Sequence, residues 1–502
     1  MKKSIFTLKN ILKSEYLSLY VLLLISAIFR FPFVLKGFGE TDAANLAVSI
    51  IDFINHGRNG FLTSLYFIDV VPLYVVYIKF IMKLSGDNYS YLPLVMNYTN
   101  AIVGTLIVIP AYLLVKRLFD NNSIAFYTVL TFIFAPSIYQ SSIYGFPHLL
   151  ALFFFITSLY FFLIWLDDTR YIWLILSFVT LTSTILLKSD FILGSGAYFG
   201  LLYIRRVKEK QKIALYCLLI ILSVISFLLL RQWMTGVNEG YTTSFTDFGK
   251  WFKHFLSPLS SKSIYRLING QAAPIAYGIG ILNFFMASIA FIFYLIKRRT
   301  DILVLVLSWT ALPTIFWLFF WINSARHNML SVLPCIMIIF LLLYEKAPRF
   351  IAFFPVIIIL GNYLITSPSA STRVPSGNLF KSQILLDNKV NNLHLAAKKI
   401  ADLEDDKIII TGEAFRPYLY YEIFSLAPEY KLIKIGDSCY MLKNKHGKCI
   451  ICNLVSEYYI KDMISKYHLE KYTIVSPLLN LTLLKEEGFK TIDKKNIEPR
   501  LY

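Results

Sequence analysis

The sequence predicts a polytopic α-helical membrane protein with a small α/β domain outside the membrane. Three observations predict this fold class. The 502 residues are 57% hydrophobic with a mean hydropathy of +0.60, which is typical of chains that cross a membrane many times. Long apolar runs recur from about residue 16 to residue 366 and are separated by short charged loops. After the serine- and proline-rich stretch 367–371, the composition becomes polar and mixed.

The change in composition divides the chain into two expected domains. Residues 1–366 are predicted to form a transmembrane domain with a large first external loop, 36–90, and residues 367–502 a soluble domain. The net charge is +18. In a membrane protein, such an excess of basic residues holds loops in the cytoplasm, near anionic lipids. None of the usual basic fold motifs is present, so we expect membrane lipids and no nucleic acid among the partners.

Basic loops also set the predicted orientation. Lys2, Lys3, Lys9 and Lys13 precede the first apolar run, which places the N-terminus in the cytoplasm. About 11 spans are predicted, over residues 16–35, 91–115, 123–142, 147–166, 171–187, 191–204, 213–230, 274–296, 301–322, 329–344 and 350–366. This arrangement keeps every short basic loop in the cytoplasm and the C-terminal domain outside. We therefore expect an integral protein of the plasma (inner) membrane of a prokaryote.

The first external loop carries two carboxylates, Glu40 and Asp42, at the start of an amphipathic helix. Its apolar residues are spaced as on one face of a helix: Ala43, Leu46, Ala47, Ile50, Ile51 and Ile54. Its polar residues fall on the other face: Asp42, Asn45, Ser49 and Asp52. Such a helix should lie along the membrane interface. A second interfacial helix is predicted over 73–84.

In the C-terminal domain, strand-like runs alternate with helical ones. Strands are predicted over 407–411, 431–435, 448–452 and 478–484, and helices over 390–403 and 456–467. Cys449 and Cys452 have CxxC spacing but no second pair, so we expect no zinc site. In a strand their side chains should point to opposite faces. A disulfide between Cys439 and Cys449 is left open.

Ionisable side chains at the outer membrane face are costly unless they are solvated or used. Glu40 and Asp42 are the leading pair, because a carboxylate can act as general base on a hydroxyl. The alternative is that Asp42 is only the N-cap of its helix. Arg58, at the other end of that helix, is either a phosphate ligand or a partner for the helix dipole.

Further cations are predicted on the same side of the membrane. Lys188 and Asp190 lie in a very short external turn, where the lysine either meets a lipid phosphate or pairs with the aspartate. Arg326 and His327 lie between two spans, and an arginine fits a phosphate through its planar fork. The alternative for Arg326 is an interfacial anchor. His148 begins a span near the outer face.

An acidic pair and several cations on one side of a helical body favour a site for an anionic, lipid-linked substrate. The cations would neutralise a phosphate as it leaves. Few charges lie at mid-span, which disfavours an ion pathway. Trp317 is interpreted as part of the interfacial aromatic belt.

Several short motifs carry a family resemblance. They are Arg30-Phe31-Pro32, Gly39-x-x-Asp42-Ala43-Ala44-x-Leu46-Ala47, Val71-Pro72-Leu73-Tyr74, Lys116-Arg117-Leu118-Phe119, Leu187-Lys188, and Ala325-Arg326-His327 leading to Leu333-Pro334. With these motifs the chain resembles the GT-C class of membrane glycosyltransferases. Its protein O-mannosyltransferase and aminoarabinose transferase relatives are the most similar. The resemblance covers roughly residues 15–345 and identifies the class better than the substrate.

The resemblance implies a GT-C-like fold and an inverting transfer on the extracytoplasmic face. The donor would be a polyprenyl- or dolichyl-phosphate sugar, and the acceptor a lipid, glycan or protein. Asp42 would be the base or would position the acceptor, and Lys188 and Arg326 would meet the donor phosphate. No cofactor is expected, and a divalent metal is not required although the acidic pair is suited to one.

The sequence also departs from the family pattern. The family often has Glu directly after the first-loop Asp, whereas here Ala43 follows Asp42 and Glu40 precedes it. The choice of base therefore stays open. An acidic residue common in the second external loop is absent, and His148 lies near that place. Further candidates for substrate contacts are His148, Asp190, His327 and Tyr74.

Two other functions stay open. A transporter or flippase of lipid-linked sugars would show internal repeats and broken mid-membrane helices, and no repeat is visible in the sequence. A polysaccharide polymerase or ligase would use a diphosphate lipid instead.

Overall fold

The structure is a computed structural model. It describes residues 14–38, 41–56, 72–84, 86, 88–143, 145–235, 272–319, 325–365, 397–402, 406–411, 419–423, 431–435, 439–444, 447–453, 456–476 and 481–492. The chain divides into two compact units. Unit 1 comprises Met1–Val34, Asp69–Tyr74 and Met96–Gln383, and unit 2 comprises Leu35–Ile68, Val75–Val95 and Ile384–Tyr502. Unit 2 therefore joins most of the first external loop to the C-terminal domain. The predicted domain boundary at residues 366 and 367 stays a prediction.

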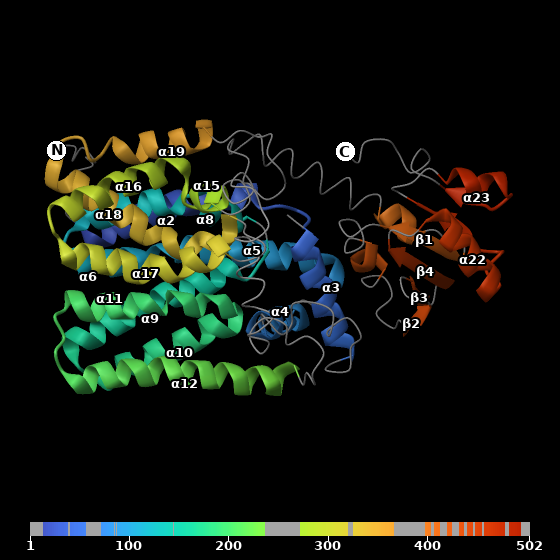
Figure 1. The fold of residues 1–502 in the computed structure, drawn as a ribbon, viewed down its shortest axis with the longest axis horizontal. Helices are drawn as coiled ribbons and strands as arrows, with labels where there is room; N and C mark the ends of the chain where they lie inside the picture. Colours follow the sequence, from blue (N-terminus) through green and yellow to red (C-terminus); the bar gives the residue numbers. More distant parts are fainter. Residues whose placement is uncertain are drawn as a thin grey trace, which may run out of the picture. The chain divides into compact units, whose positions relative to one another are not determined.

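Unit 1 is built of apolar helices that lie side by side (Figure 1). Its first elements are α2 (Glu15–Ile28), η1 (Phe31–Phe33), α5 (Leu92–Leu106), α6 (Val108–Phe119), α7 (Asn122–Ile133), α8 (Pro136–Ser141), α9 (His148–Asp168), α10 (Tyr171–Leu187), η5 (Ser189–Ser195), α11 (Gly196–Ile204) and α12 (Lys210–Thr235). They are followed by α15 (Ala273–Ile279), α16 (Ile281–Ile296), α17 (Thr300–Phe319), η7 (Ala325–Ser331), α18 (Val332–Lys346) and α19 (Phe354–Ile365).

The membrane character of the predicted fold is confirmed. Among the described residues, six helices are long and apolar enough to cross a membrane, and one bent helix pair brings the number to seven. Shorter apolar helices cover Asn122–Ile133, Tyr171–Leu187 and Phe354–Leu364. The number of about 11 spans stays a prediction.

The predicted span 274–296 is not one straight helix. It is broken into α15 and α16, which meet at an angle of 94°. Gly280 lies at the break with φ +100°, a conformation that favours glycine. The side-chain oxygen of Asn362 on α19 accepts a hydrogen bond from the Leu282 N–H at 2.8 Å, so it caps the start of α16. The spacing of apolar residues in the sequence gives no information on a cap that comes from another helix, so the break was not predicted.

Ion pairs gather at the end of unit 1 that was predicted to be cytoplasmic. Asp167, at the end of α9, pairs with Arg117 at 2.8 Å and with Arg205 at 3.1 Å. Arg299, before α17, pairs with Glu345 at the end of α18 at 3.6 Å. These residues come from five predicted loops or helix ends, and a shifted span would have separated them. Their association agrees with the predicted alternation of the helices.

The described helices of the first external loop are α3 (Thr41–His56), α4 (Pro72–Leu84) and η4 (Tyr89–Tyr91), which belong to unit 2 except for the first three residues of α4. Both predicted loop helices are present. However, the polar face of α3 is only partly open to water, since Ser49 and Asp52 are buried. Within unit 2, the Tyr89 hydroxyl donates to the side-chain oxygen of Asn55, near the end of α3, at 2.8 Å.

The C-terminal part of unit 2 contains a six-stranded sheet with the order β2-β3-β4-β1-β5-β6. Its elements are β1 (Lys407–Thr411), β2 (Lys431–Ile435), β3 (Cys439–Asn444), β4 (Gly447–Asn453), α22 (Glu457–Tyr467), β5 (Thr473–Val475), α23 (Thr482–Glu486) and β6 (Thr491–Ile492). β4, β1, β5 and β6 are parallel, and β2, β3 and β4 are antiparallel. Side chains of α22 and α23 share one hydrophobic core with β1, β3, β4 and β5.

The prediction of a strand over 478–484 is wrong, because residues 482–486 form α23. Leu484 packs into the core on one side of this short helix. Gly488, with φ +85°, then ends the helix as a C-terminal glycine does. Lysine and glutamate around Leu484 favour helix over strand.

Strands β3, β5 and β6 were not predicted. Of the predicted helix 390–403, residues 390–396 and 403 lie outside the described residues, and residues 397–401 are helical.

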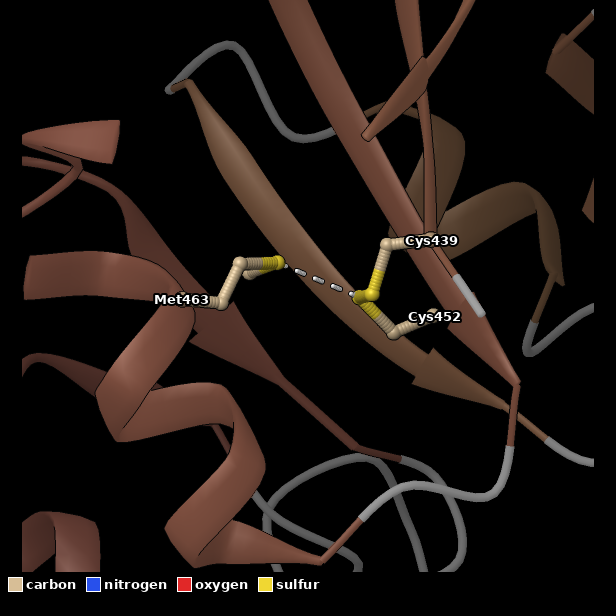
Figure 2. The surroundings of a disulfide bond; sticks show 3 residues. All are labelled: Cys439, Cys452 and Met463. Atoms are coloured by element: carbon tan, nitrogen blue, oxygen red, sulfur yellow. Dashed lines mark hydrogen bonds between the residues drawn. A yellow bond between two sulfur atoms is a disulfide. The ribbon is translucent and has the colours of Figure 1, made fainter. Parts of the chain in front are cut away.

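Cysteines of adjacent strands form a disulfide, Cys439–Cys452, on β3 and β4 (Figure 2). The Sγ of Cys452 also lies 3.9 Å from the Sδ of Met463 on α22. Cys449 is a buried free thiol. Cys452 belongs to the core shared with α22, whereas Cys449 does not. The predicted opposite orientation of these two side chains explains why Cys439 bonds to Cys452 and not to Cys449.

Candidate functional site

One end of unit 1 gathers the predicted site residues Lys188, Asp190, His148, Arg326 and His327. Helix α9 starts at His148 and has 21 residues, so it is about 30 Å long. Its far end carries the ion pairs of Asp167. Helix α10 runs back beside α9 and ends just before Lys188. The predicted clustering of these residues therefore follows from two antiparallel helices and their neighbours.

Lys188 marks the point where α10 changes into the short helix η5. Its backbone is extended, with φ −160°, and its N–H still donates to the Thr184 carbonyl. The lysine Nζ lies 3.2 Å from Asp190 Oδ1, and their side chains are only 13% and 10% exposed. The ion pair left open by the sequence is therefore present. A phosphate at this place would have to share the lysine with a carboxylate.

The turn that leads to His148 is fixed by α5. The side-chain amide of Asn100 donates to the carbonyls of Ser141 and Phe146, at 3.1 and 2.7 Å. The side-chain oxygen of Asn97 accepts from the Gly145 N–H. A Cβ on Gly145 would lie 2.3 Å from the Cβ of Met96, so only glycine fits at this close approach.

Aromatic rings from four segments form a continuous stack beside this turn. Trp317 of α17 stacks on His327 with ring centroids 3.9 Å apart. His327 stacks on His148 at 5.6 Å, and His148 on Phe146 at 4.9 Å. Trp317 is 5% exposed, so the interpretation as a membrane-belt residue is wrong. Its side chain packs on the histidine pair instead of facing lipid.

Arg326 closes the stack at its other end. Its guanidinium carbon lies 4.8 Å from the Phe146 ring centroid, within the range of a cation–π contact. Arg326 and His327 both lie on η7, which packs against α15, α8 and α17. The broken helix α15 thus supports the segment that presents the arginine.

Polar atoms of the two histidines lack partners within the described part of the chain. Both ring nitrogens of His148 and Nδ1 of His327 are buried and accept or donate no hydrogen bond there. His148 is 1% exposed. The positive charges of Lys188 and Arg326 act on both rings. A buried polar group without a hydrogen bond costs about 1–3 kcal/mol, so these nitrogens are suited to a ligand oxygen.

Whether the remaining predicted residues join this cluster stays a prediction. Asp42 lies in unit 2, in the first turn of α3, one residue inside the helix rather than before it. A carboxylate in this position is stabilised by the helix dipole. Tyr74 is buried in α4. Glu40 and Arg58 lie outside the described residues. The convergence of Asp42 with Lys188 and Arg326 stays a prediction.

Sequence reasoning missed four contributors, Asn97, Asn100, Phe146 and Phe191. The signal for the asparagines was two amides in an apolar run, where a buried polar group must find partners. Phe191 contacts His148 with ring centroids 6.4 Å apart. No signal distinguished Phe146 or Phe191 from the other phenylalanines. Within the described ranges, no group of three His, Cys, Asp or Glu side chains is placed to hold a metal ion.

Comparison with known proteins finds one family model and several solved structures that are similar to this chain. A model of the family described as dolichyl-phosphate-mannose-protein mannosyltransferase matches residues 69–230, less than half of the chain. The structure of ArnT from Cupriavidus metallidurans in the apo state is 12% identical and has a TM-score of 0.51. The match covers 80% of this chain and 84% of that one. This chain therefore has a GT-C-like fold.

Two other solved structures match this chain with TM-scores below 0.5. The Archaeoglobus fulgidus oligosaccharyltransferase in the apo form is 11% identical with a TM-score of 0.48. The match covers 82% of this chain but only 63% of the oligosaccharyltransferase. A structure of C. metallidurans ArnT bound to undecaprenyl phosphate is 13% identical with a TM-score of 0.48, covering 82% of this chain and 76% of that chain. No curated protein matches the sequence.

Proposed function

We propose that this protein is an inverting glycosyltransferase that moves a sugar from a polyprenyl- or dolichyl-phosphate donor to an acceptor hydroxyl. The observation that carries the proposal is the cluster of Lys188, Arg326 and the buried His148 at one end of a GT-C-like fold. Lys188 and His148 lie within the segment that matches the dolichyl-phosphate-mannose-protein mannosyltransferase family. Cations and hydrogen-bond donors held in a poorly hydrated place stabilise a departing phosphate best.

The proposed reaction is a single displacement. The acceptor oxygen bonds to the anomeric carbon as the bond between that carbon and the phosphate oxygen breaks. The bonding electrons leave with the lipid phosphate, and the hydroxyl proton passes to the carboxylate of Asp42. Glu40 remains the alternative base. A phosphate in a diester carries one negative charge and gains a second as it leaves, so Lys188 and Arg326 bind it more strongly late in the reaction.

The disulfide supports an extracytoplasmic site. Disulfides persist in oxidising compartments, which lie outside the plasma membrane of a prokaryote. Cys439–Cys452 belongs to unit 2, and so does the helix that carries Asp42. One compact unit lies on one side of a membrane, which is consistent with an external first loop and an external C-terminal domain. The N-terminus would then be cytoplasmic, as the basic residues predict.

A transporter or flippase of lipid-linked sugars is the second candidate. The observation that favours it is the break between α15 and α16, because transporters use broken helices. In this chain α15 packs against η7, which carries Arg326, and this gives the break a role in supporting the phosphate site. The two functions differ in whether the bond between sugar and phosphate is broken.

The test compares transfer with lipid movement in the same protein. Purified wild-type protein, Asp42→Asn and Glu40→Gln are incubated with radiolabelled polyprenyl-phosphate hexoses and cell-envelope acceptors. In parallel, the three proteins are placed in vesicles and scrambling of the same lipids is measured. The proposal predicts transfer by the wild type and loss in at least one variant. Absence of transfer with every donor, with equal scrambling by all three proteins, would support the transporter and contradict the enzyme.

A further inference from the structure

Tyr421, a buried tyrosine of the C-terminal domain, lies against the chain beside the helix of the acidic loop. This residue lies in a short helical segment, 419–423, which follows strand β1 in the chain. The Tyr421 side chain is only 2% exposed. A tyrosine this deeply buried is expected to have a defined partner for its hydroxyl.

The ring of Tyr421 contacts the chain just before α3. It packs edge-on against Phe38, with ring centroids 4.8 Å apart and an interplanar angle of 89°. Phe38 is fully buried and lies three residues before the first residue of α3, Thr41. An edge-to-face pair of buried aromatic rings adds about 0.5–1.5 kcal/mol to the area that it buries. This contact fixes the chain that enters the acidic helix.

The hydroxyl of Tyr421 reaches the other end of the same helix through one intermediate. It donates to the Tyr89 carbonyl at 2.7 Å. The Tyr89 hydroxyl in turn donates to the Asn55 side chain, near the end of α3, at 2.8 Å. Burial raises the pKa of Tyr421, so its hydroxyl remains a donor throughout the physiological pH range. Tyr421 is thus linked to both ends of α3.

The apolar face of α3 is buried. Ala43, Ala44, Leu46 and Ala47 are all fully buried. Because alanine side chains allow close approach, the helix is held on its apolar face as well. The orientation of Asp42, in the first turn, follows from the position of the helix as a whole.

From this chain of contacts we infer that Tyr421 is a positioning residue, through which the C-terminal domain sets the place of the Asp42 helix. The inference rests on the proposed function for the role of Asp42, but its structural part does not. It gives the C-terminal domain a role in assembling the site, beyond any contact with an acceptor. A displacement of about 1 Å in a catalytic group can lower a rate by about 100-fold.

The structural part is tested by hydrogen exchange on the full-length protein. The variants are Tyr421→Ala, Tyr421→Phe, which keeps the ring on Phe38, and the control Tyr458→Ala, a tyrosine of α22 that is 70% exposed. The α3 amides, residues 41–56, are expected to exchange at least about tenfold faster in Tyr421→Ala than in the wild type. The acceleration should be smaller in Tyr421→Phe, and the control should exchange at the wild-type rate. Equal exchange in α3 of Tyr421→Ala and the control overturns the inference, whether or not the protein is a transferase.

The functional part is tested by comparing kcat for transfer with the Kd for a polyprenyl phosphate. Tyr421→Ala is expected to lower kcat for transfer by about 100-fold, while its Kd for a polyprenyl phosphate in detergent stays within about twofold of the wild type. Tyr421→Phe should recover most of kcat. Equal losses of kcat and polyprenyl-phosphate affinity would indicate general unfolding and overturn a positioning role. Normal kcat with faster α3 exchange would also overturn it, and would leave the proposed transferase standing.

Discussion

The Nζ of Lys188 lies 3.2 Å from Oδ1 of Asp190, and neither side chain is more than 13% exposed. A nearly buried lysine is therefore already paired before any phosphate arrives. Such a pair holds the lysine in place and also weakens its attraction for a second anion. Substitution of the aspartate therefore tests phosphate binding as directly as substitution of the lysine.

Replacing Asp190 with Asn should tighten the binding of a polyprenyl phosphate by about 5- to 10-fold, since the whole charge of Lys188 then acts on the ligand. The same change should lower the melting temperature without ligand, because a buried charge has lost its partner. Thermal unfolding with and without a polyprenyl phosphate measures both effects. A ligand-induced shift no larger than that of the wild type would show that Asp190 does not compete with the phosphate.

Arg326→Gln should lower transfer by about 100-fold or more, the typical loss when a group that stabilises developing charge is removed. The matched control is Arg170→Gln, because Arg170 pairs with Asp168 at the opposite end of α9 and is 69% exposed. That surface pair contributes little, so the control should keep its activity. Initial rates with saturating donor make the comparison. Comparable activity in the two variants would remove Arg326 from the phosphate site.

His148→Phe keeps an aromatic ring between Phe146 and His327 but removes both nitrogens. We expect the protein to fold and the Kd for a polyprenyl phosphate to rise by about 5- to 10-fold, the effect of one lost hydrogen bond to a charged group. His148→Asn and His148→Gln place an amide near Nδ1 or Nε2, and one of them should recover binding. Wild-type affinity in the Phe variant would mean that the imidazole serves only to pack the stack.

The buried thiol of Cys449 gives a prediction on pH. Burial raises the pKa of this thiol from 9.0 to about 12. The folded state favours the protonated thiol. The stability that this thiol contributes is therefore fully present below pH 9 and is lost as the pH rises from about 9 to about 12. The free energies of unfolding of the wild type and of Cys449→Val, measured with denaturant at several pH values, should diverge over that pH range. The expected difference in slope is about 1.4 kcal/mol per pH unit, and parallel curves would contradict it.

The helical body was predictable because its signals are local and strong. Apolar runs with basic ends placed His148, Lys188 and Arg326 at one end of unit 1, and the Asp167 pairs at the other end agree with this alternation. Where the prediction failed, the cause lay in contacts between elements distant in sequence. The cap after Gly280 comes from Asn362 on another helix, and the hydrogen bond on Asn55 of α3 comes from Tyr89 in a later segment.

The candidate site was predictable in its charges but not in its packing. Lysine, arginine and aspartate at an outer membrane face are costly and therefore informative. Phe146 and Trp317 lie among many other aromatic residues, and nothing in the local sequence distinguishes a stacking partner of histidine from a lipid-facing ring. The link from Tyr421 to Phe38 joins residues at opposite ends of the chain. Periodicity and composition contain no information on such a pair.

The most direct test of the central claim follows both products of the reaction in one incubation. A donor labelled in the lipid and in the sugar, such as a polyprenyl-phosphate hexose, is mixed with the purified protein and cell-envelope acceptors. We predict that one polyprenyl phosphate appears for each sugar transferred, with inverted anomeric configuration, and that Asp42→Asn or Glu40→Gln abolishes both products. Movement of intact donor across vesicles without release of polyprenyl phosphate would contradict the account.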